Sequence, residues 1–209
     1  MHGASKDGQV VAIPNAGGNG AFVLHRADHR VVRLAPHYDV RSCAVSPDGG
    51  LVATGRHWES KDPGARVWDA QTGKLVRDLP VASGAVQFSP DGKWLLTSNG
   101  SRIWSVGTWK EGPALGTPAL TWAAFSADSS LLALTDVPGV VRLVRPESGR
   151  EVARLSAPVQ SRLHPYCFTP DGTRLVCQGV ETESLHIFRL DLIRRQLAEL
   201  ATTHLVGRG

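Results

Sequence analysis

Residues 36–79 read PHYDVRSCAVSPDGGLVATGRHWESKDPGARVWDAQTGKLVRDL, and this stretch decides the fold. Four short apolar segments rich in Val and Leu are separated by polar turn residues, and they span residues 40–45, 51–54, 65–68 and 74–79. The turn Ser46-Pro47-Asp48-Gly49 combines a proline, which fixes its own φ, with an Asp-Gly pair that tolerates positive φ. Short β-prone segments separated by such turns predict a four-stranded antiparallel meander.

The aspartate of this turn recurs along the chain, in similar Ser/Thr-x-Asp turns, at positions 7, 48, 91, 128 and 171. The spacings are 41, 43, 37 and 43 residues. A period of about 40 residues with four apolar segments in each copy is typical of β-propeller blades. The sequence therefore predicts an all-β fold, a partial or open β-propeller of about five four-stranded blades. The expected blades are residues 1–35, 36–80, 81–116, 117–156 and 157–190, followed by a C-terminal helix and tail at 191–209.

The two ends of the chain depart from the repeat. Because residues 1–4 alone precede the first turn, we expect the first blade to be incomplete and to lack its inner strand. Residues 191–200 contain strong helix formers with Asp191 as an N-cap, and they favour a short helix, with a fourth strand as the alternative. Five partial blades favour the C-terminal part of a longer seven- or eight-bladed ring over a closed five-bladed ring or an oligomer that completes the ring.

The stretch 36–79 resembles a WD40 repeat, because Pro36-His37 stands near the position of the usual Gly-His pair and Trp68-Asp69 stands at the dipeptide that names the family. The resemblance implies a buried, hydrogen-bonded tetrad of structural role, made of His37, Thr54, Asp62 and Trp68. Such a chain satisfies an imidazole and an indole N–H that would otherwise cost a few kcal/mol each to bury. The end of the sequence also resembles the tail of WD40 regions in bacterial multi-domain proteins, in particular those linked to planctomycete-type serine/threonine kinases.

Composition places the chain among soluble globular proteins, with 42% hydrophobic residues and a net charge of +4. The basic residues are dispersed, so nucleic acid is an unlikely partner by composition. No apolar run approaches the length of a membrane span, which argues against a membrane partner and makes the cytoplasm the default expectation. Three cysteines without CxxC spacing, Cys43, Cys167 and Cys177, are predicted to be reduced core thiols.

The search for catalytic motifs gives no candidate. The sequence contains no GxSxG elbow, no HExxH helix, no P-loop and no paired histidines at metal-ligand spacing, so we expect no catalytic residue, metal or cofactor. The glycine-rich stretch 15–20 is not followed by a helix or by Lys-Ser/Thr, and it is interpreted as a turn. His25, Asp28 and His29 are interpreted as turn residues exposed to solvent.

The function predicted from the repeat is a non-catalytic scaffold that binds a protein or peptide. In a propeller, the link into the inner strand and the link between the second and third strands emerge on one face. In the second blade these links and the adjacent strand end carry residue types that often dominate interfaces, namely Tyr38, Arg41, Arg56, His57 and Trp58. The indole of Trp58 has a structural alternative, since it can fold over the neighbouring blade. Open blade ends also predict self-association. A hydrolase- or lactonase-like propeller enzyme, or a truncated gene product without independent function, are the alternatives.

Overall fold

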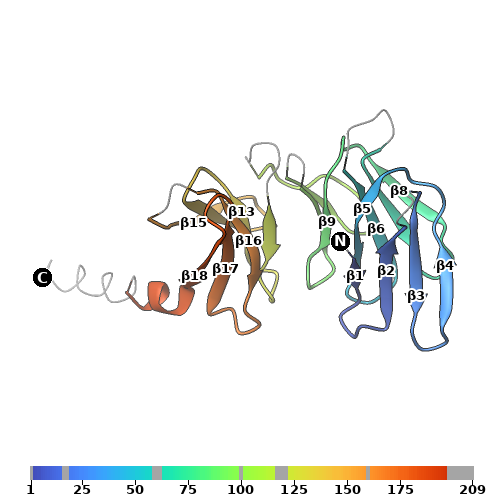
Figure 1. Ribbon diagram of the computed structural model, residues 1–209, viewed down its shortest axis with the longest axis horizontal. Coiled ribbons are helices and arrows are strands. Elements are labelled where there is room, and N and C mark those ends of the chain that lie inside the picture. The colour runs from blue at the N-terminus through green and yellow to red at the C-terminus, as the bar shows by residue number, and fades with distance from the viewer. Residues whose placement is uncertain are drawn as a thin grey trace, which may run out of the picture. The chain divides into compact units, whose positions relative to one another are not determined.

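The computed structural model describes residues 2–15, 19–57, 63–98, 101–115, 122–158 and 161–196. In these ranges the strands form five separate antiparallel sheets that follow one another along the sequence, three with four strands and two with three (Figure 1). Each sheet pairs strands that are consecutive in the chain, as propeller blades do. The predicted all-β fold of successive blades is therefore confirmed.

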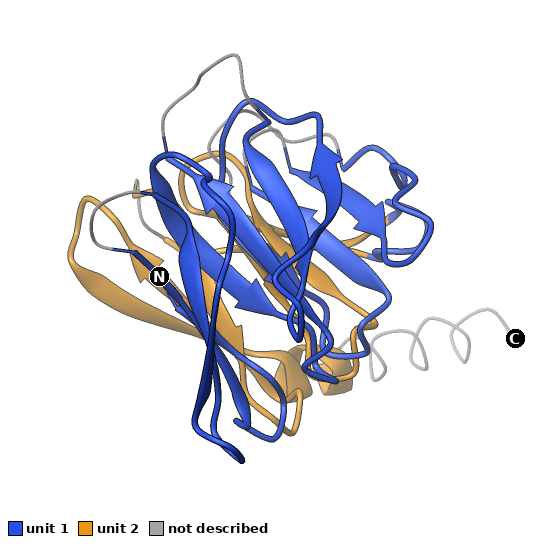
Figure 2. Cartoon of the chain, turned by 90° about the vertical axis from the view of Figure 1, so that its right-hand side faces the viewer, with its two compact units in different colours: residues 1–121, 145–150 blue, residues 122–144, 151–209 orange. Residues whose placement is uncertain are grey.

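The chain divides into two compact units (Figure 2). The first contains residues 1–121 and 145–150, and the second contains residues 122–144 and 151–209. Blades one to three belong to the first unit, and the strands of blades four and five belong to the second. No helix in the described ranges is long and apolar enough to cross a membrane.

Blade one contains four strands, so the expectation that it lacks its inner strand is wrong. Its strands are β1 (Gly3–Ala4), β2 (Val10–Pro14), β3 (Ala21–His25) and β4 (Arg30–Arg33). Two residues before the turn are enough for β1 to pair with β2, and a Cβ on Gly3 would lie 2.7 Å from the Cα of Ala44. The inner strand is thus short and packs closely on blade two.

Blade two matches the expected meander. Its strands are β5 (Val40–Val45), β6 (Leu51–Arg56), β7 (Ala65–Asp69) and β8 (Leu75–Leu79). The pairing of β5 with β6 shifts between Val40 and Ser42, which leaves Arg41 as an extra residue in the inner strand.

Blade three has three strands in its described residues, where four were expected. They are β9 (Val86–Phe88), β10 (Trp94–Thr97) and β11 (Arg102–Ser105). At the outer position a single bridge joins Trp104 to Glu111, flanked by backbone bonds from Ser105 to Lys110 and from Gly112 to Ile103. Blade four has all four strands, namely β12 (Ala123–Phe125), β13 (Leu132–Thr135), β14 (Val140–Val144) and β15 (Glu151–Ser156).

Blade five ends in a helix instead of an outer strand. Its sheet contains β16 (Leu163–Phe168), β17 (Arg174–Gly179) and β18 (Ser184–Arg189), and residues 190–196 are helical. The predicted helix is confirmed for 191–196, while 197–200 lie outside the described residues. Blade five is consequently three-stranded, as the favoured helix implied, and the alternative of a fourth strand at 191–196 is wrong.

The repeated turn is the same hydrogen-bonded unit in every blade. The Ser46 hydroxyl donates to Asp48 Oδ1 at 2.5 Å, and the Gly50 N–H donates to the same oxygen at 3.0 Å. The Leu51 N–H donates to Ser46 Oγ at 2.9 Å, which closes the loop onto β6. The four other turns repeat the Ser/Thr-to-Asp bond. The residue after each aspartate has positive φ, and these residues are Gly8, Gly49, Gly92, Ser129 and Gly172.

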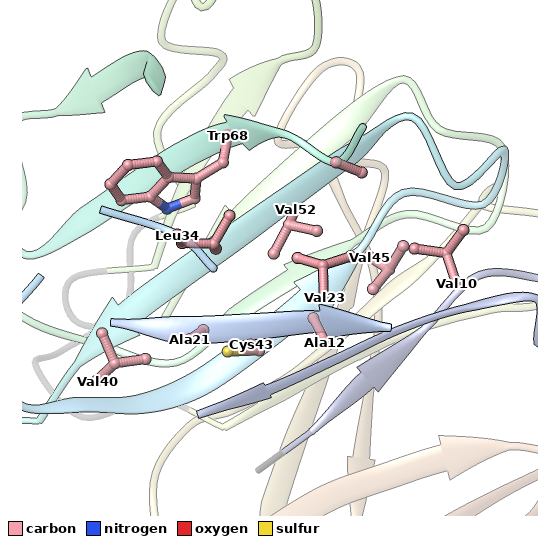
Figure 3. Close-up of a cluster of buried hydrophobic side chains, with 11 residues drawn as sticks. Val10, Ala12, Ala21, Val23, Leu34, Val40, Cys43, Val45, Val52 and Trp68 are labelled. Carbon is pink, nitrogen blue, oxygen red and sulfur yellow. The ribbon is translucent and has the colours of Figure 1, made fainter. Parts of the chain in front are cut away.

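The core consists of apolar residues between successive sheets. One cluster joins β2 and β3 of blade one to β5, β6 and β7 of blade two, with Val23 facing a group that includes Val52 and Trp68 (Figure 3). A second cluster joins blades two and three, and a third joins blades four and five. Cys43 and Cys177 are buried, and burial raises the pKa of each thiol to about 12. Cys167 is exposed, so its assignment as a core thiol is wrong, because its side chain lies on a sheet face that no strand of the second unit covers.

Replacing Gly49 with alanine tests the turn. Gly49 has φ of 75°, and an added Cβ would lie 3.0 Å from Val10 Cγ2. We expect Gly49→Ala to lower the free energy of unfolding by about 1–2 kcal/mol, since a left-handed conformation costs about that much with a side chain. Gly50→Ala is the matched control, because its Cβ would meet Asp48 at 3.5 Å without a positive φ. Urea unfolding measures both, and equal losses in the two variants would contradict this account.

Candidate functional site

Three members of the expected tetrad form one hydrogen-bonded chain in blade two. The Trp68 Nε1–H donates to Thr54 Oγ1 at 2.8 Å, and Thr54 Oγ1 lies 2.8 Å from His37 Nδ1. His37 Nε2 lies 3.1 Å from the carbonyl oxygen of Pro63, which can only accept. The proton therefore sits on Nε2, and Nδ1 accepts the Thr54 hydroxyl proton. Every polar atom of the chain has a partner when the imidazole is neutral.

The surroundings of His37 keep it neutral. Its side chain is 1% exposed, and burial lowers the pKa of His37 to about 4, with Arg66 and Arg56 adding to the effect. A histidine that is neutral, buried and bonded through both ring nitrogens has no atom left to exchange a proton with a substrate. Its chemistry is that of a structural hydrogen bond. Asp62 lies outside the described residues, and its place in the tetrad stays a prediction.

The other blades contain less of this polar chain. In blade three the Trp104 Nε1–H donates to Thr97 Oγ1 at 3.2 Å, and no histidine takes part. In blade four Val144 stands at the position of Trp68, opposite Leu132. Leu134 stands at the position of Thr54, and the hydroxyl of the next residue, Thr135, donates to the carbonyl of Leu163 at 3.0 Å.

The predicted binding residues of blade two lie partly together at the surface. Tyr38 is 59% exposed immediately before β5, and Arg41 is an exposed residue of β5 whose Nε donates to Asp39 Oδ1 at 3.0 Å. His57 follows β6 and is exposed, and its backbone N–H donates to the carbonyl of Asp39 at 3.3 Å. This bond holds the loop before β5 beside the end of β6. A tyrosine, an arginine and a histidine thus share one small patch.

Two of the five predicted residues do not join this patch. Arg56 is 6% exposed at the end of β6, where its backbone bonds to Gly64 and Gly84. A buried side chain cannot present a surface to a partner, so its assignment as a contact residue is wrong. Trp58 lies outside the described residues.

The sequence reading missed an aromatic cluster in the second unit. The ring of Trp122 stacks on His164 with centroids 5.0 Å apart, and it lies 6.4 Å from the ring of Tyr166 at an angle of 24°. Trp122 and Tyr166 are both exposed. Trp122 precedes β12, whereas His164 and Tyr166 lie on β16, so the signal was the recurrence of aromatic residues around two successive inner strands.

Groups that could bind a metal or transfer a proton were sought in the described residues. Among them, no group of three or more His, Cys, Asp or Glu side chains could hold a metal ion. A cavity of about 150 Å³ in the second unit is lined by residues that include Asp128, Asp171 and Arg194. Both carboxylates bond within their own turns, and the Thr169 hydroxyl is the main cause that lowers the pKa of Asp171 to about 2. Neither is available as an acid or a base near neutral pH.

A known repeat family matches the chain at blade two. The family model "WD domain, G-beta repeat" matches residues 29–69, which end at the Trp-Asp dipeptide of β7. Translation initiation factor 3 subunit I of Neosartorya fischeri is 41% identical over 66 residues, covering 31% of this chain and 18% of the relative. The small ribosomal subunit protein RACK1z of Arabidopsis thaliana is 39% identical over 71 residues, covering 32% and 20%. These matches support a WD40 family for the chain.

The chain spans about a fifth of the length of these curated relatives. A solved structure, the hydrazine synthase of Kuenenia stuttgartiensis, superimposes with a TM-score of 0.67 over 84% of this chain and 54% of that one. At 20% identity this likeness concerns the fold alone.

Replacing Thr54 with valine tests the WD40 polar chain. Thr54→Val leaves both the Trp68 N–H and the His37 Nδ1 without their partner, whereas Thr97→Val in blade three affects one indole N–H. We expect losses in the free energy of unfolding of about 2–4 kcal/mol and about 1–2 kcal/mol respectively, since each orphaned buried group costs about 1–3 kcal/mol. Urea unfolding of the two variants measures the difference. A loss for Thr54→Val no larger than that for Thr97→Val would show that His37 contributes nothing.

The pKa of His37 predicts a dependence of stability on pH. The unfolded chain protonates this imidazole near pH 6.5 and the folded chain near pH 4, so the unfolded state binds more protons between these values. Stability is complete above pH 6.5 and falls as the pH falls towards 4. Between pH 7 and pH 5 we expect a loss of about 2 kcal/mol from this group.

The matched control is His37→Gln, in which this part of the pH dependence should disappear. His164 contributes in the same direction, because burial also lowers its pKa, so His164→Gln provides the second control. Unfolding titrations at the two pH values give the comparison. Identical pH dependence in wild type and His37→Gln would rule out a depressed pKa at His37.

Proposed function

We propose that this WD40-type chain is a non-catalytic interaction module that binds a protein or peptide through the patch formed by Tyr38, Arg41 and His57, with Trp58 as a fourth contact. The observation that carries the proposal is the exposure of these three described side chains on the loop before β5, at the start of β5 and at the end of β6, where the Asp39–His57 backbone bond joins the two segments. Tyrosine and arginine supply large contact areas that keep a polar atom for pairing, which is the usual chemistry of interface hot spots.

The scaffold beneath the patch suits recognition. Blade two is packed on both faces by apolar clusters and contains the buried chain of His37, Thr54 and Trp68. A patch on a rigid sheet loses little conformational entropy when a partner binds. The buried polar groups that could have suggested catalysis are all engaged in structural bonds, so binding explains the exposed residues better than chemistry does.

The matched relatives are consistent with this role. One is a subunit of a translation initiation factor and another is a ribosomal protein, and both are components of assemblies. We extend to this chain the role of a part that contacts other proteins, and the cytoplasm as its location. From the resemblance of the C-terminal tail we also propose that the chain is bacterial and related to planctomycete-type proteins linked to kinases.

Site-specific photocrosslinking tests the patch. A photoreactive phenylalanine analogue replaces Tyr38 in one protein and Val76 in another, because Val76 on β8 is also exposed but lies outside the patch. We expect Tyr38 to crosslink a defined protein in lysate of the source organism, and we expect Val76 not to do so. Trp58→Ala in the Tyr38 protein should reduce that crosslink several-fold while the circular dichroism spectrum stays unchanged.

Two outcomes would reject the proposal. Equal crosslinking of the same proteins at positions 38 and 76 would mean that contact at the patch is nonspecific. The same crosslink yield with and without Trp58→Ala, in folded protein, would remove Trp58 from the contact.

A further inference from the structure

Blade five has an exposed apolar face at positions that are buried elsewhere in the chain. In blade two, Ala65 and Val67 of β7 are 1% and 0% exposed, because they lie in the cluster that blade three covers. The corresponding residues of β18 in blade five are Leu185 and Ile187, which are 72% and 56% exposed. The sheet face that carries these positions is called the back face, and the opposite face, which carries Trp68 in blade two, is called the front face.

The strand registers confirm that these positions correspond. In blade two, Ala53 pairs with Val67 and also with Ala44 of the inner strand. In blade five, Val176 pairs with Ile187 and also with Cys167 of the inner strand. Cys167 is exposed and Val176 is half-buried, so the whole row across the back face lacks cover within the second unit.

The front face of blade one lacks cover in the same way. One cross-strand row of this face pairs Val11 with Leu24, at the positions of Val52 and Trp68 in blade two. The other row pairs Ile13 with Phe22, at the positions of Thr54 and Arg66. Ile13 is 48% exposed and Phe22 is 36% exposed, whereas Thr54 is fully buried. In blade two these positions face the back of blade one, as the cluster in Figure 3 shows. Blade one therefore presents an apolar front face that no other blade of the first unit covers.

Side-chain size indicates that these two faces fit each other. A Trp on the front face of one blade packs against small residues on the third strand of the preceding blade. Trp68 of blade two packs in a cluster with Ala21 and Val23 of blade one. Trp104 of blade three packs in a cluster with Ala65 and Val67 of blade two. Where the front residue is Phe188, in blade five, the residues opposite are larger, Val141 and Leu143.

Blade five continues this trend, because its back face carries the still larger pair Leu185 and Ile187. Blade one carries the smaller Leu24 at the Trp position of its front face. Since packed interiors keep a nearly constant density, a large back pair requires a small front residue. Leu24 meets this requirement, whereas a Trp would overfill the contact.

We propose that the back face of blade five binds the front face of blade one of a second copy of this chain. The contact is heterologous, since it joins two different surfaces, and the resulting dimer keeps one free face of each kind. It places Leu185 and Ile187 against the Ile13–Phe22 and Val11–Leu24 rows. The binding surface on blade two is separate, and this contact does not depend on the proposed function.

Two single substitutions separate this pairing from its alternatives. Phe22→Asp blocks the front face of blade one, and Leu185→Asp blocks the back face of blade five. Val76→Asp and Val152→Asp are the matched controls, because both residues are comparably exposed on the outer strands β8 and β15 and lie at bulges. Circular dichroism and thermal unfolding confirm that each variant is folded.

Sedimentation velocity of the 209-residue chain, from low to high micromolar concentration, measures association. We expect wild type and both controls to associate, and each face variant alone to associate at least about tenfold more weakly. A mixture of Phe22→Asp with Leu185→Asp should form a 1:1 dimer, because the intact back face of the first meets the intact front face of the second.

Three results would each overturn the proposal. Wild type that stays monomeric at every concentration shows that a second copy is not the occupant. Association of Phe22→Asp alone at wild-type strength shows that back faces pair with each other. A mixture that stays monomeric while wild type associates shows that the contact lies elsewhere.

Discussion

Each sheet in this chain is apolar on both faces, and this constraint shapes most of the structure. A strand whose successive side chains point to opposite faces buries both sets only if a sheet lies on either side. Blade two satisfies the requirement, with Val52 and Trp68 in one cluster and Ala53 and Val67 in another. Because hydrophobic burial is the main favourable term in folding, one isolated blade has little stability, and repetition of the blade is the physical solution.

The second requirement is to bury backbone and polar side chains without orphaned groups. The Ser/Thr-x-Asp turns satisfy the polar groups of the first hairpin of every blade, since one aspartate oxygen accepts both a hydroxyl and a backbone N–H. The chain of Trp68, Thr54 and His37 does it for the aromatic residue that fills the space between blades one and two. Where the aromatic residue is absent, as at Val144, the polar chain is absent too. The polar chain thus accompanies the tryptophan and is independent of chemistry on a substrate.

These regularities explain what the sequence could predict. Turn chemistry repeats at the level of single residues, so the strands of blade two and the positive φ at Gly49 could be foreseen from residues 46–49 alone. The short β1 could not, because its pairing depends on the close approach of Gly3 to Ala44, which are far apart in the sequence. The missing outer strand of blade five had a local signal, the helix formers after Asp191, whereas the missing outer strand of blade three was not predicted.

The candidate site was predictable to a similar extent. Topology brings the loop before β5 to the end of β6, where the His57 N–H bonds to the carbonyl of Asp39, and the role of Tyr38 and His57 in binding stays a prediction. Whether a residue at a strand end points outward depends on the bulge and the next blade, so Arg56 was assigned to the surface although it is buried. The cluster of Trp122, His164 and Tyr166 was missed because its sequence signal, aromatic residues around two successive inner strands, does not indicate which rings stack.

The same reasoning locates where recognition can occur in this fold. Sheet faces between neighbouring blades are buried by packing, and the polar groups at the strand ends are bonded in turns. The residues free to vary there are those at the starts of inner strands and in the loops beside them. An extra residue in an inner strand, such as Arg41 in β5 or Tyr166 in β16, turns its side chain out of the alternation that packing demands. Two blades from different units thus expose large side chains at a register shift. A bulge in the inner strand is therefore the device by which a fully packed blade presents a contact residue without opening its core.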